Sequence, residues 1–321
     1  MEFSFAALGS NLLAPTILFF VLGLVAALAR SDLSIPDGAA KIMSIYLLLA
    51  IGFKGGVAVA DSGITIQLVS ALIAGILLSF LLPFIAFGLL RLMTKLDVVN
   101  AAAVAGHYGS ISIVTFVTAV SLLETRGIPS EGYLVAVAAV MEVPAIISAL
   151  WLASRKTEAS MNSDMFRHII GNGSIVLLIG SFVIGALTGQ SGLAQLKPFI
   201  VVPFTGVLCV FLLDMGLSAG KSLMKNKKDI TLGLLAFGCV MPLVGSVFGW
   251  IAGYLLGLSS GGVFLLMTLS ASASYIAVPA AMRLALPQAK SGIFLSLSLG
   301  VTFPFNLTIG LPIYMALSGW I

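Results

Sequence analysis

Two short polar stretches lie inside otherwise apolar segments, and their residue types suit the binding of a small anion. The first runs Gly106-His107-Tyr108-Gly109-Ser110-Ile111-Ser112-Ile113-Val114-Thr115, and the second runs Thr268-Leu269-Ser270-Ala271-Ser272-Ala273-Ser274-Tyr275-Ile276-Ala277-Val278-Pro279. Glycine, serine and proline at this density predict interrupted helices, whose freed backbone groups are tolerated in a membrane only where they face protein or water. A half-helix that starts at such an interruption presents unpaired N–H groups and the positive end of its dipole, which attract an anion. Side-chain hydroxyls add neutral donors, and the expected substrate-binding residues are Ser110, Ser112, Thr115, Ser272, Ser274 and Tyr275.

His107 and Tyr275 border these two interruptions. Each side chain is able to hydrogen-bond a substrate or to gate a cavity, and the alternative for His107 is a packing role with one satisfied polar atom. The position of Tyr275 within the interruption favours a functional role. For the serines the alternative is helix packing, in which small residues allow close approach and hydroxyls bond back to their own helix. Their occurrence in two corresponding segments favours binding.

Two acidic residues lie within apolar segments, where ionisable groups are costly and usually functional. Glu142 is suited to bind a cation or to carry a proton. Thr302 occupies the corresponding place in the second half of the chain, and Asn306 follows one helical turn later, so their oxygens are candidates to complete a sodium shell. Asp214 is assigned a secondary or gating role. The alternative for each acid is a structural partner, which for Asp214 is Lys54.

The composition places all of these groups inside a membrane. Of 321 residues, 60% are hydrophobic and 9% are charged, against about 25% charged in a typical soluble domain, and the mean hydropathy is +1.16. We therefore expect an all-α polytopic membrane protein with ten transmembrane helices and no soluble catalytic domain. The expected spans lie near 12–30, 38–60, 65–93, 98–123, 132–155, 173–189, 198–222, 229–257, 261–284 and 290–318.

Other features of the sequence exclude several functions. Cys209 and Cys239 lie in apolar runs, so no disulfide framework, metal site or cofactor is expected, apart from a sodium ion. The basic residues lie in short loops and not among aromatic residues, so nucleic acid is not an expected partner. His107 and His168 lie in separate regions, which argues against an intramembrane hydrolase and against an enzyme. No basic region precedes the first apolar run, so no cleaved signal peptide is expected.

The two halves of the chain match each other in order. The segment 49–56 (LAIGFKGG) aligns with 213–220 (LDMGLSAG), and Glu142-Val143-Pro144 aligns with Thr302-Phe303-Pro304. Because the matched segments lie five spans apart, the second copy enters the membrane from the opposite side. Such an inverted repeat is typical of secondary transporters.

The distribution of basic residues predicts the orientation, since short cytoplasmic loops carry an excess of Lys and Arg. Thirteen of the 16 Lys and Arg residues lie in odd-numbered loops or at their borders: Arg30, Lys41, Arg91, Lys95, Arg155, Lys156, Arg167, Lys221, Lys225, Lys227, Lys228, Arg283 and Lys290. We therefore expect both termini outside, the central linker in the cytoplasm, and a location in the bacterial inner (plasma) membrane.

The chain resembles the sodium-dependent bicarbonate transporter family, the SbtA-like permeases, over almost its whole length. The resemblance is carried by the following residues, in the family's order and spacing: Ile51-Gly52-Phe53-Lys54-Gly55-Gly56; Tyr108-Gly109-Ser110-Ile111-Ser112 with Thr115; Leu123-Glu124; Met141-Glu142-Val143-Pro144-Ala145; and Ser274-Tyr275-Ile276 with Pro279, Arg283 and Pro287. It implies two inverted five-helix repeats, with interrupted helices four and nine crossing in a core domain. It also implies an elevator mechanism, a homotrimer, and bicarbonate bound beside sodium. The implied gate domain comprises residues 1–62 and 173–228, the core domain comprises 63–155 and 229–321, and a cytoplasmic linker covers 156–172.

The chain departs from the family pattern at both interruptions. Ser112-Ile113-Val114-Thr115 replaces a Ser-Gly-Ser-Thr run, and Tyr275 stands where the family has an aspartate suited to sodium. The central linker is also shorter than in better-known members, so a soluble PII-like regulator is not an expected partner.

The expected function is secondary-active transport of a small anion, most simply sodium-dependent bicarbonate symport. One alternative is a proton-coupled carrier of a small organic acid, with Ile113, Val114 and Val278 lining an apolar pocket. A second alternative is a membrane receptor or regulatory platform that uses the same scaffold without transport.

Overall fold

The computed structural model describes residues 13–154, 173–275, 278–279, 281–282 and 286–319, and over these residues the regular structure is entirely helical. Seven described helical stretches are long and apolar enough to cross a membrane. They are α3 (Asp37–Ser62), α4 (Ile66–Met93), α7 with α8 (Leu134–Val140 and Glu142–Ser154), α10 (Gly173–Ile200), α11 (Phe204–Lys225), α12 (Leu232–Leu255), and the run from α15 (Ser291–Leu297) through α16 (Phe303–Phe305) to α17 (Leu311–Ser318). Three shorter apolar helices are α2 (Pro15–Leu28), α5 (Val98–His107) and α13 (Ser260–Ala271), and α6 (Ile113–Arg126) follows α5.

Each of the ten expected spans has a helical counterpart, but α2, α5 and α13 are shorter than full spans. The expected span at 98–123 is two helices, because α5 ends at His107 and α6 begins at Ile113. The expected boundary at 189 coincides with a break inside α10, and a second helical stretch follows it as far as Ile200. Gly189 adopts φ 56° and ψ −149°, which kinks the chain before the helix resumes. The expected linker at 156–172 lies outside the described residues.

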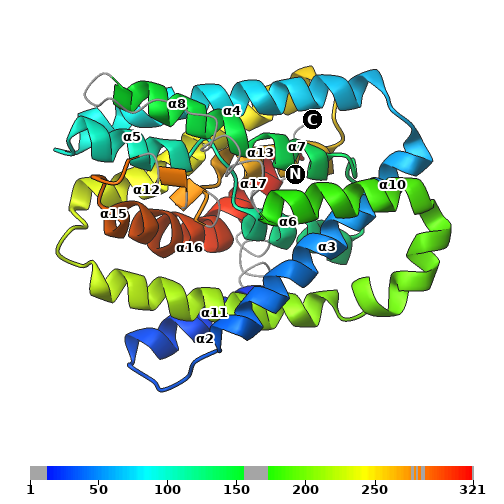
Figure 1. Cartoon of the computed structure of the whole chain (residues 1–321), viewed down its shortest axis with the longest axis horizontal. Helices are drawn as coiled ribbons and strands as arrows, with labels where there is room; N and C mark the ends of the chain where they lie inside the picture. Colours follow the sequence, from blue (N-terminus) through cyan, green and yellow to red (C-terminus); the bar gives the residue numbers. More distant parts are fainter. Residues whose placement is uncertain (1–12, 155–172, 276–277, 280, 283–285, 320–321) are drawn as a thin grey trace.

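Two closely packed helix pairs form one side of the molecule, α2 with α11 and α3 with α10 (Figure 1). Close approach depends on glycine. A Cβ atom at Gly216 of α11 would lie 2.1 Å from the carbonyl oxygen of Phe20, and one at Gly56 of α3 would lie 1.9 Å from that of Phe182. Small residues allow this backbone contact between membrane helices.

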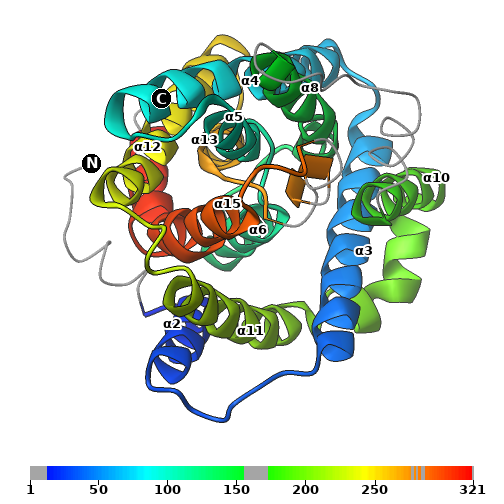
Figure 2. The same cartoon turned by 60° about the vertical axis from the view of Figure 1, so that its left-hand side comes forward.

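In Figure 2, α5 and α13 lie inside a ring to which α4, α8, α12 and α15 belong. Every residue of α13 is buried except Ser260 at its start, as are the residues of α5 from Asn100 to His107. Both central helices are therefore enclosed by protein, which is the environment that interrupted helices need in a membrane.

The C-terminal run contains two π-helical segments, Ser298–Thr302 and Asn306–Gly310, on either side of α16. Pro304 and Pro312 lie in this run and lack the amide needed for regular α-helical bonding. Single-turn π segments often occur at functional sites. Here they determine the positions of Thr302 and Asn306.

Candidate functional site: the crossing of two interrupted helices

Two backbone interruptions meet in the centre of the molecule, and we call the residues 108–112 and 272–275 the crossing. The amide of Ser112 donates a hydrogen bond to Oγ of Ser272 (2.9 Å), and the amide of Ser274 donates to the carbonyl oxygen of His107 (2.8 Å). Ser110, Ser112, Ser272 and Ser274 are each at most 3% exposed. The structure therefore brings the serines expected to bind substrate into one buried junction.

The start of α6 supplies donors to this junction. Ser112 caps the helix: its Oγ accepts hydrogen bonds from the amide (3.2 Å) and the hydroxyl (2.9 Å) of Thr115. The amides of Ile113 and Val114 donate to no described residue, as the first N–H groups of a helix have no intrahelical acceptor. Two free amides at the positive end of a helix dipole are suited to an anion.

A small void is lined in part by Ile113 and Val114. It has a volume of about 10 Å³ and is lined by α3, α6 and α11, including Leu47, Leu48, Ile113 and Val114. This volume is about the space that a single water molecule requires. The described conformation is therefore closed beside the start of α6, and an anion needs a shift of the surrounding helices to bind there.

Tyr275 and His107 each carry a buried polar atom without a hydrogen-bond partner among the described residues. The hydroxyl of Tyr275 lies beside Ser112, and its ring contacts that of Phe303 edge to face, with centroids 5.3 Å apart. His107 Nδ1 lies 2.7 Å from the carbonyl oxygen of Ala103, while its ring stacks on Phe294 and Nε2 is unpaired. An unpaired buried group is costly, so both atoms are candidates to bind a ligand or water.

Glu142 lies at the start of α8 and accepts a short hydrogen bond from the hydroxyl of Ser110. Its exposed fraction is 8%, and no ion pair to it occurs among the described residues. Nearby, Ser79 of α4 donates to the carbonyl oxygen of Met141 and accepts from the amide of Ala145 (3.1 Å). The first turn of α8 is thus fixed against α4, with the Glu142 carboxyl group beside the crossing.

Thr302 and Asn306 lie in hydrogen-bonded positions of their own. The hydroxyl of Thr302 donates to the carbonyl oxygen of Gly238 (2.8 Å) and bonds the hydroxyl of Tyr108 (2.6 Å). Asn306 donates to the carbonyl oxygen of Ala271 (2.9 Å) and accepts from Tyr314 (2.8 Å). No described hydrogen bond joins either residue to Glu142. Glu142 and Thr302 therefore contact the crossing at Ser110 and Tyr108, and Asn306 contacts Ala271, the residue directly before its second segment.

Lys54 does not pair with Asp214. Its Nζ forms an ion pair with Glu124 and lies 2.5 Å from Oε1 of that residue. Asp214 is half-buried in α11, and the charged groups that act on it are Lys221 and Asp37. The structural partner considered for Asp214 was therefore wrong, and its role stays a prediction.

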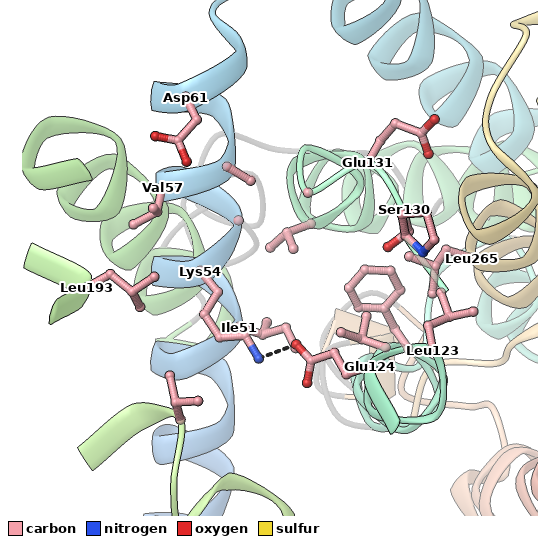
Figure 3. Close-up of a pocket in the computed structure, with 18 of the residues that line it drawn as sticks. Ile51, Lys54, Val57, Asp61, Leu123, Glu124, Ser130, Glu131, Leu193 and Leu265 are labelled. Atoms are coloured by element: carbon pink, nitrogen blue, oxygen red, sulfur yellow. Dashed lines mark hydrogen bonds and ion pairs between the residues drawn. The ribbon is translucent and has the colours of Figure 1, made fainter. Parts of the chain in front are cut away.

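A larger cavity lies beside the Lys54–Glu124 pair. It has a volume of about 650 Å³ and lies between α3 and α10 on one side and α6, α7 and the segment 128–132 on the other. Figure 3 shows Lys54 and Glu124 directed toward each other across it. The sequence interpretation missed this cavity, although a single lysine in an apolar span is itself a sign of a nearby partner or aqueous space.

The crossing of two interrupted helices inside a multi-pass helical protein is an arrangement expected of a transporter. The protein matches none of the curated proteins with which it was compared. A protein-family model described as the Na⁺-dependent bicarbonate transporter superfamily matches residues 15–319. The chain is thus a multi-pass membrane protein of a transporter family and not of an enzyme family, and it belongs to the Na⁺-dependent bicarbonate transporter superfamily.

Proposed function

We propose that the protein is a secondary-active symporter of a small anion, bicarbonate, driven by sodium. The family membership supports the substrate and the coupling ion. The observation that carries the proposal is the crossing, where the free amides of Ile113 and Val114 lie near Ser112 and the unpaired hydroxyl of Tyr275. These are neutral donors, which bind a monovalent anion without a permanent positive charge in the membrane.

Sodium would be held at the same junction, beside Ser110. Glu142 contributes a carboxylate and already contacts Ser110, which belongs to the crossing. Thr302 and Asn306 contribute oxygens after a rearrangement of their present hydrogen bonds. Binding both ions at one junction cancels much of their charge, which matters because moving an unpaired charge through hydrocarbon costs several kcal/mol or more.

Transport would occur by an elevator movement of a core domain (63–155 and 229–321) against a gate domain (1–62 and 173–228). The helix pairs α2 with α11 and α3 with α10 support this division, because each pair joins one helix from each half of the gate domain. Aligned glycines also support the inverted repeat. Gly52 packs on Ser181 and Gly216 packs on Phe20, so equivalent positions make equivalent close contacts.

The same proposal includes assembly as a homotrimer and an orientation in the membrane. Exposed apolar side chains along α2 and α10, such as Leu22, Val25, Ile184 and Leu187, are available to lipid or to the other copies of a homotrimer. The excess of basic residues in odd-numbered loops supports a cytoplasmic linker and external termini in a bacterial inner membrane.

The decisive experiment is uptake of labelled bicarbonate into proteoliposomes at fixed pH, with and without an inward sodium gradient. We expect sodium-driven uptake by the intact protein and its loss in Glu142→Gln. Asp229→Asn, which changes an exposed acid, is the matched control and should retain uptake. Protein-free liposomes measure carbon dioxide leakage. Bicarbonate uptake that is absent under every gradient would overturn the proposal.

One observation favours a second candidate, a proton-coupled carrier of a small organic acid. The void beside α6 is lined by Leu47, Leu48, Val114 and Val117, whose apolar side chains suit an alkyl group better than a hydrated anion. Uptake of a labelled organic acid such as propionate, driven by a pH gradient and indifferent to sodium, would support this candidate. In that case Glu142 would carry the proton.

A further inference from the structure

The cavity of about 650 Å³ differs from the crossing in its chemistry. Most of its walls are apolar, formed by residues such as Ile51, Val57, Phe116 and Leu265. In Figure 3, Asp61 lies further along α3 than Lys54, and Ile51 lies beyond Lys54 in the other direction. Lys54 is the only basic residue among the described residues that line the cavity.

The two partners of the ion pair are held unequally. The side chain of Lys54 is 19% exposed, and its ammonium also lies over the ring of Phe204, 4.7 Å from the centroid. The side chain of Glu124 is 48% exposed, and Lys54 is the described partner of its carboxylate. A cation–π contact retains the ammonium in place when the carboxylate leaves. Glu124 is therefore the partner that another anion can replace at Lys54, since its carboxylate can turn toward water at little cost in free energy.

We propose that Lys54 is an anion-binding residue of this cavity, at which a small oxyanion replaces Glu124 on its way to the crossing. This inference rests on the proposed function for its substrate, and it adds a second binding position that lies outside the two interruptions. The ammonium supplies charge-assisted hydrogen bonds to the oxyanion. The ring of Phe204 holds the ammonium on the cavity side of α3 while the anion exchanges.

The cavity ends close to the crossing on both α3 and α6. Phe116 lines the cavity and follows Ser112 by four residues, about 6 Å along α6 at a rise of 1.5 Å per residue. On α3, Ile51 lines the cavity, and Leu47 one turn before it lines the small void beside Val114. A closed apolar contact about one helical turn thick thus separates the cavity from the start of α6. Lys54 is placed to hold the anion before that contact opens.

The other charges of the cavity favour the co-transported cation. Asp61 accepts a hydrogen bond from Gln190 (2.6 Å), and Glu131 accepts from the amide (2.7 Å) and hydroxyl (2.9 Å) of Ser259. These neutral donors fix the carboxylates without cancelling their charge. The local field therefore attracts sodium to the cavity, while Lys54 provides the positive charge that an anion requires.

Uptake kinetics test the inference, because substitutions of Lys54 and of Glu124 should change the KM for bicarbonate in opposite directions. Lys54→Gln should raise the KM for bicarbonate about tenfold, which is the loss of about 1.4 kcal/mol of binding, with little change in the maximal rate. Glu124→Gln removes the competitor and should lower KM. Lys197→Gln, which changes an exposed lysine outside the cavity, should leave KM unchanged. If the pair only stabilises the fold, both partner substitutions lower the amount of folded protein and neither changes KM, which would overturn the inference.

A second measurement does not require transport. Trinitrobenzenesulfonate labels lysine amines, and mass spectrometry of peptides reports the labelling rate at Lys54 and at Lys197 separately. We expect nitrate, a planar oxyanion that does not react with amines, to slow labelling at Lys54 only, and Glu124→Gln to speed it in the absence of nitrate. If nitrate protects Lys54 from labelling and no bicarbonate uptake occurs, the anion site is supported and the proposed function is overturned. Sodium-driven uptake with an unchanged KM in Lys54→Gln and no protection would overturn the site alone.

Discussion

The amide of Ser112 donates a hydrogen bond of 2.9 Å to Oγ of Ser272, a residue 160 positions later in the chain. The same Oγ donates to the carbonyl oxygen of Leu269 in its own helix, also at 2.9 Å. The Ser272 side chain therefore hydrogen-bonds two backbone groups at once: a carbonyl oxygen in the last turn of α13 and the amide of Ser112, the residue that caps α6. Neither interruption is stable alone in a membrane, and this bond explains how each completes the other.

Ser272→Ala should destabilise the protein by about 1–3 kcal/mol, because it leaves the buried amide of Ser112 without an acceptor. Thermal unfolding in detergent, followed by size-exclusion chromatography, measures the change. Ser270→Ala is the matched control. Ser270 is equally buried and its hydroxyl has no partner among the described residues, so its removal should be nearly neutral. Equal effects of the two substitutions would contradict the importance of the Ser112–Ser272 bond.

Replacing the glycines between the paired helices with alanine should destabilise the protein. The loss from helix separation should exceed the gain from the higher helix propensity of alanine. Gly56→Ala and Gly216→Ala each place a methyl group about 2 Å from a carbonyl oxygen of the neighbouring helix, so the helices must separate. Gly206→Ala is the control within α11, since a Cβ atom added there would meet nothing within 4 Å. It should be neutral or stabilising by up to about 1 kcal/mol from helix propensity.

The yield of monodisperse protein after heating distinguishes these variants. If Gly56→Ala and Gly216→Ala retain the yield of Gly206→Ala, the close pairing of α2 with α11 and of α3 with α10 is wrong. An effect of alanine at only one of the two aligned positions, Gly52 and Gly216, would instead argue against the inverted repeat.

The helical interruption at 108–112 could be predicted because its cause is local. Gly109, Ser110 and Ser112 stand together in an apolar segment, and Ser112 is followed by Thr115 at the spacing of a helix cap. The membrane location likewise follows from composition alone. The break at Gly189 within α10 also has a local cause, because glycine readily adopts the positive φ that ends one helix before the next begins.

The Lys54–Glu124 pair could not be predicted from either local pattern. The two residues are 70 positions apart and belong to segments with no sequence match to each other. Alignment of the two halves placed Lys54 opposite the segment of Asp214, which suggested the wrong partner. Only the packing of α3 beside α6 shows which carboxylate the lysine reaches. For the same reason the cavity between these helices had no signature in the sequence.

The stability of α5 should depend on pH through Asp97, which precedes the helix. Burial alone would raise the pKa of Asp97, but hydrogen bonds from the amide (2.9 Å) and side chain (2.6 Å) of Asn100 outweigh it and lower that pKa. The ionised cap therefore contributes fully above the ordinary aspartate pKa of about 3.9. Its contribution is lost as the pH falls through the lowered pKa of the folded state.

Asp97→Ala should cost about 0.5–2 kcal/mol at neutral pH, and the difference from the intact protein should shrink as the pH falls below ~4, near the ordinary aspartate pKa. Melting temperatures across this pH range provide the measurement. Asp97→Asn keeps a capping side chain without the charge, so it should restore much of the stability with less dependence on pH. A constant deficit of Asp97→Ala at every pH would show that the carboxylate is not the cap.

A substitution of Tyr275 should change substrate binding without changing the stability of the protein. Its buried hydroxyl has no described partner, so Tyr275→Phe should leave the melting temperature unchanged or slightly higher. If the hydroxyl contacts the anion beside Ser112, the same change should raise the KM for bicarbonate by about tenfold, the effect of losing roughly 1.4 kcal/mol. Tyr133→Phe is the matched control, because Tyr133 also carries an unpartnered buried hydroxyl among the described residues but lies at the start of α7.

Tyr275→Asp tests the departure from the family pattern at the same position. An aspartate beside the crossing restores a carboxylate suited to sodium, so the dependence of uptake on the sodium gradient should become steeper than in the intact protein. Uptake over a series of sodium concentrations at fixed bicarbonate measures this dependence. A lower apparent sodium affinity, with the protein still folded, would mean that Tyr275 does not occupy the cation position and that Glu142 with Ser110 holds sodium without it.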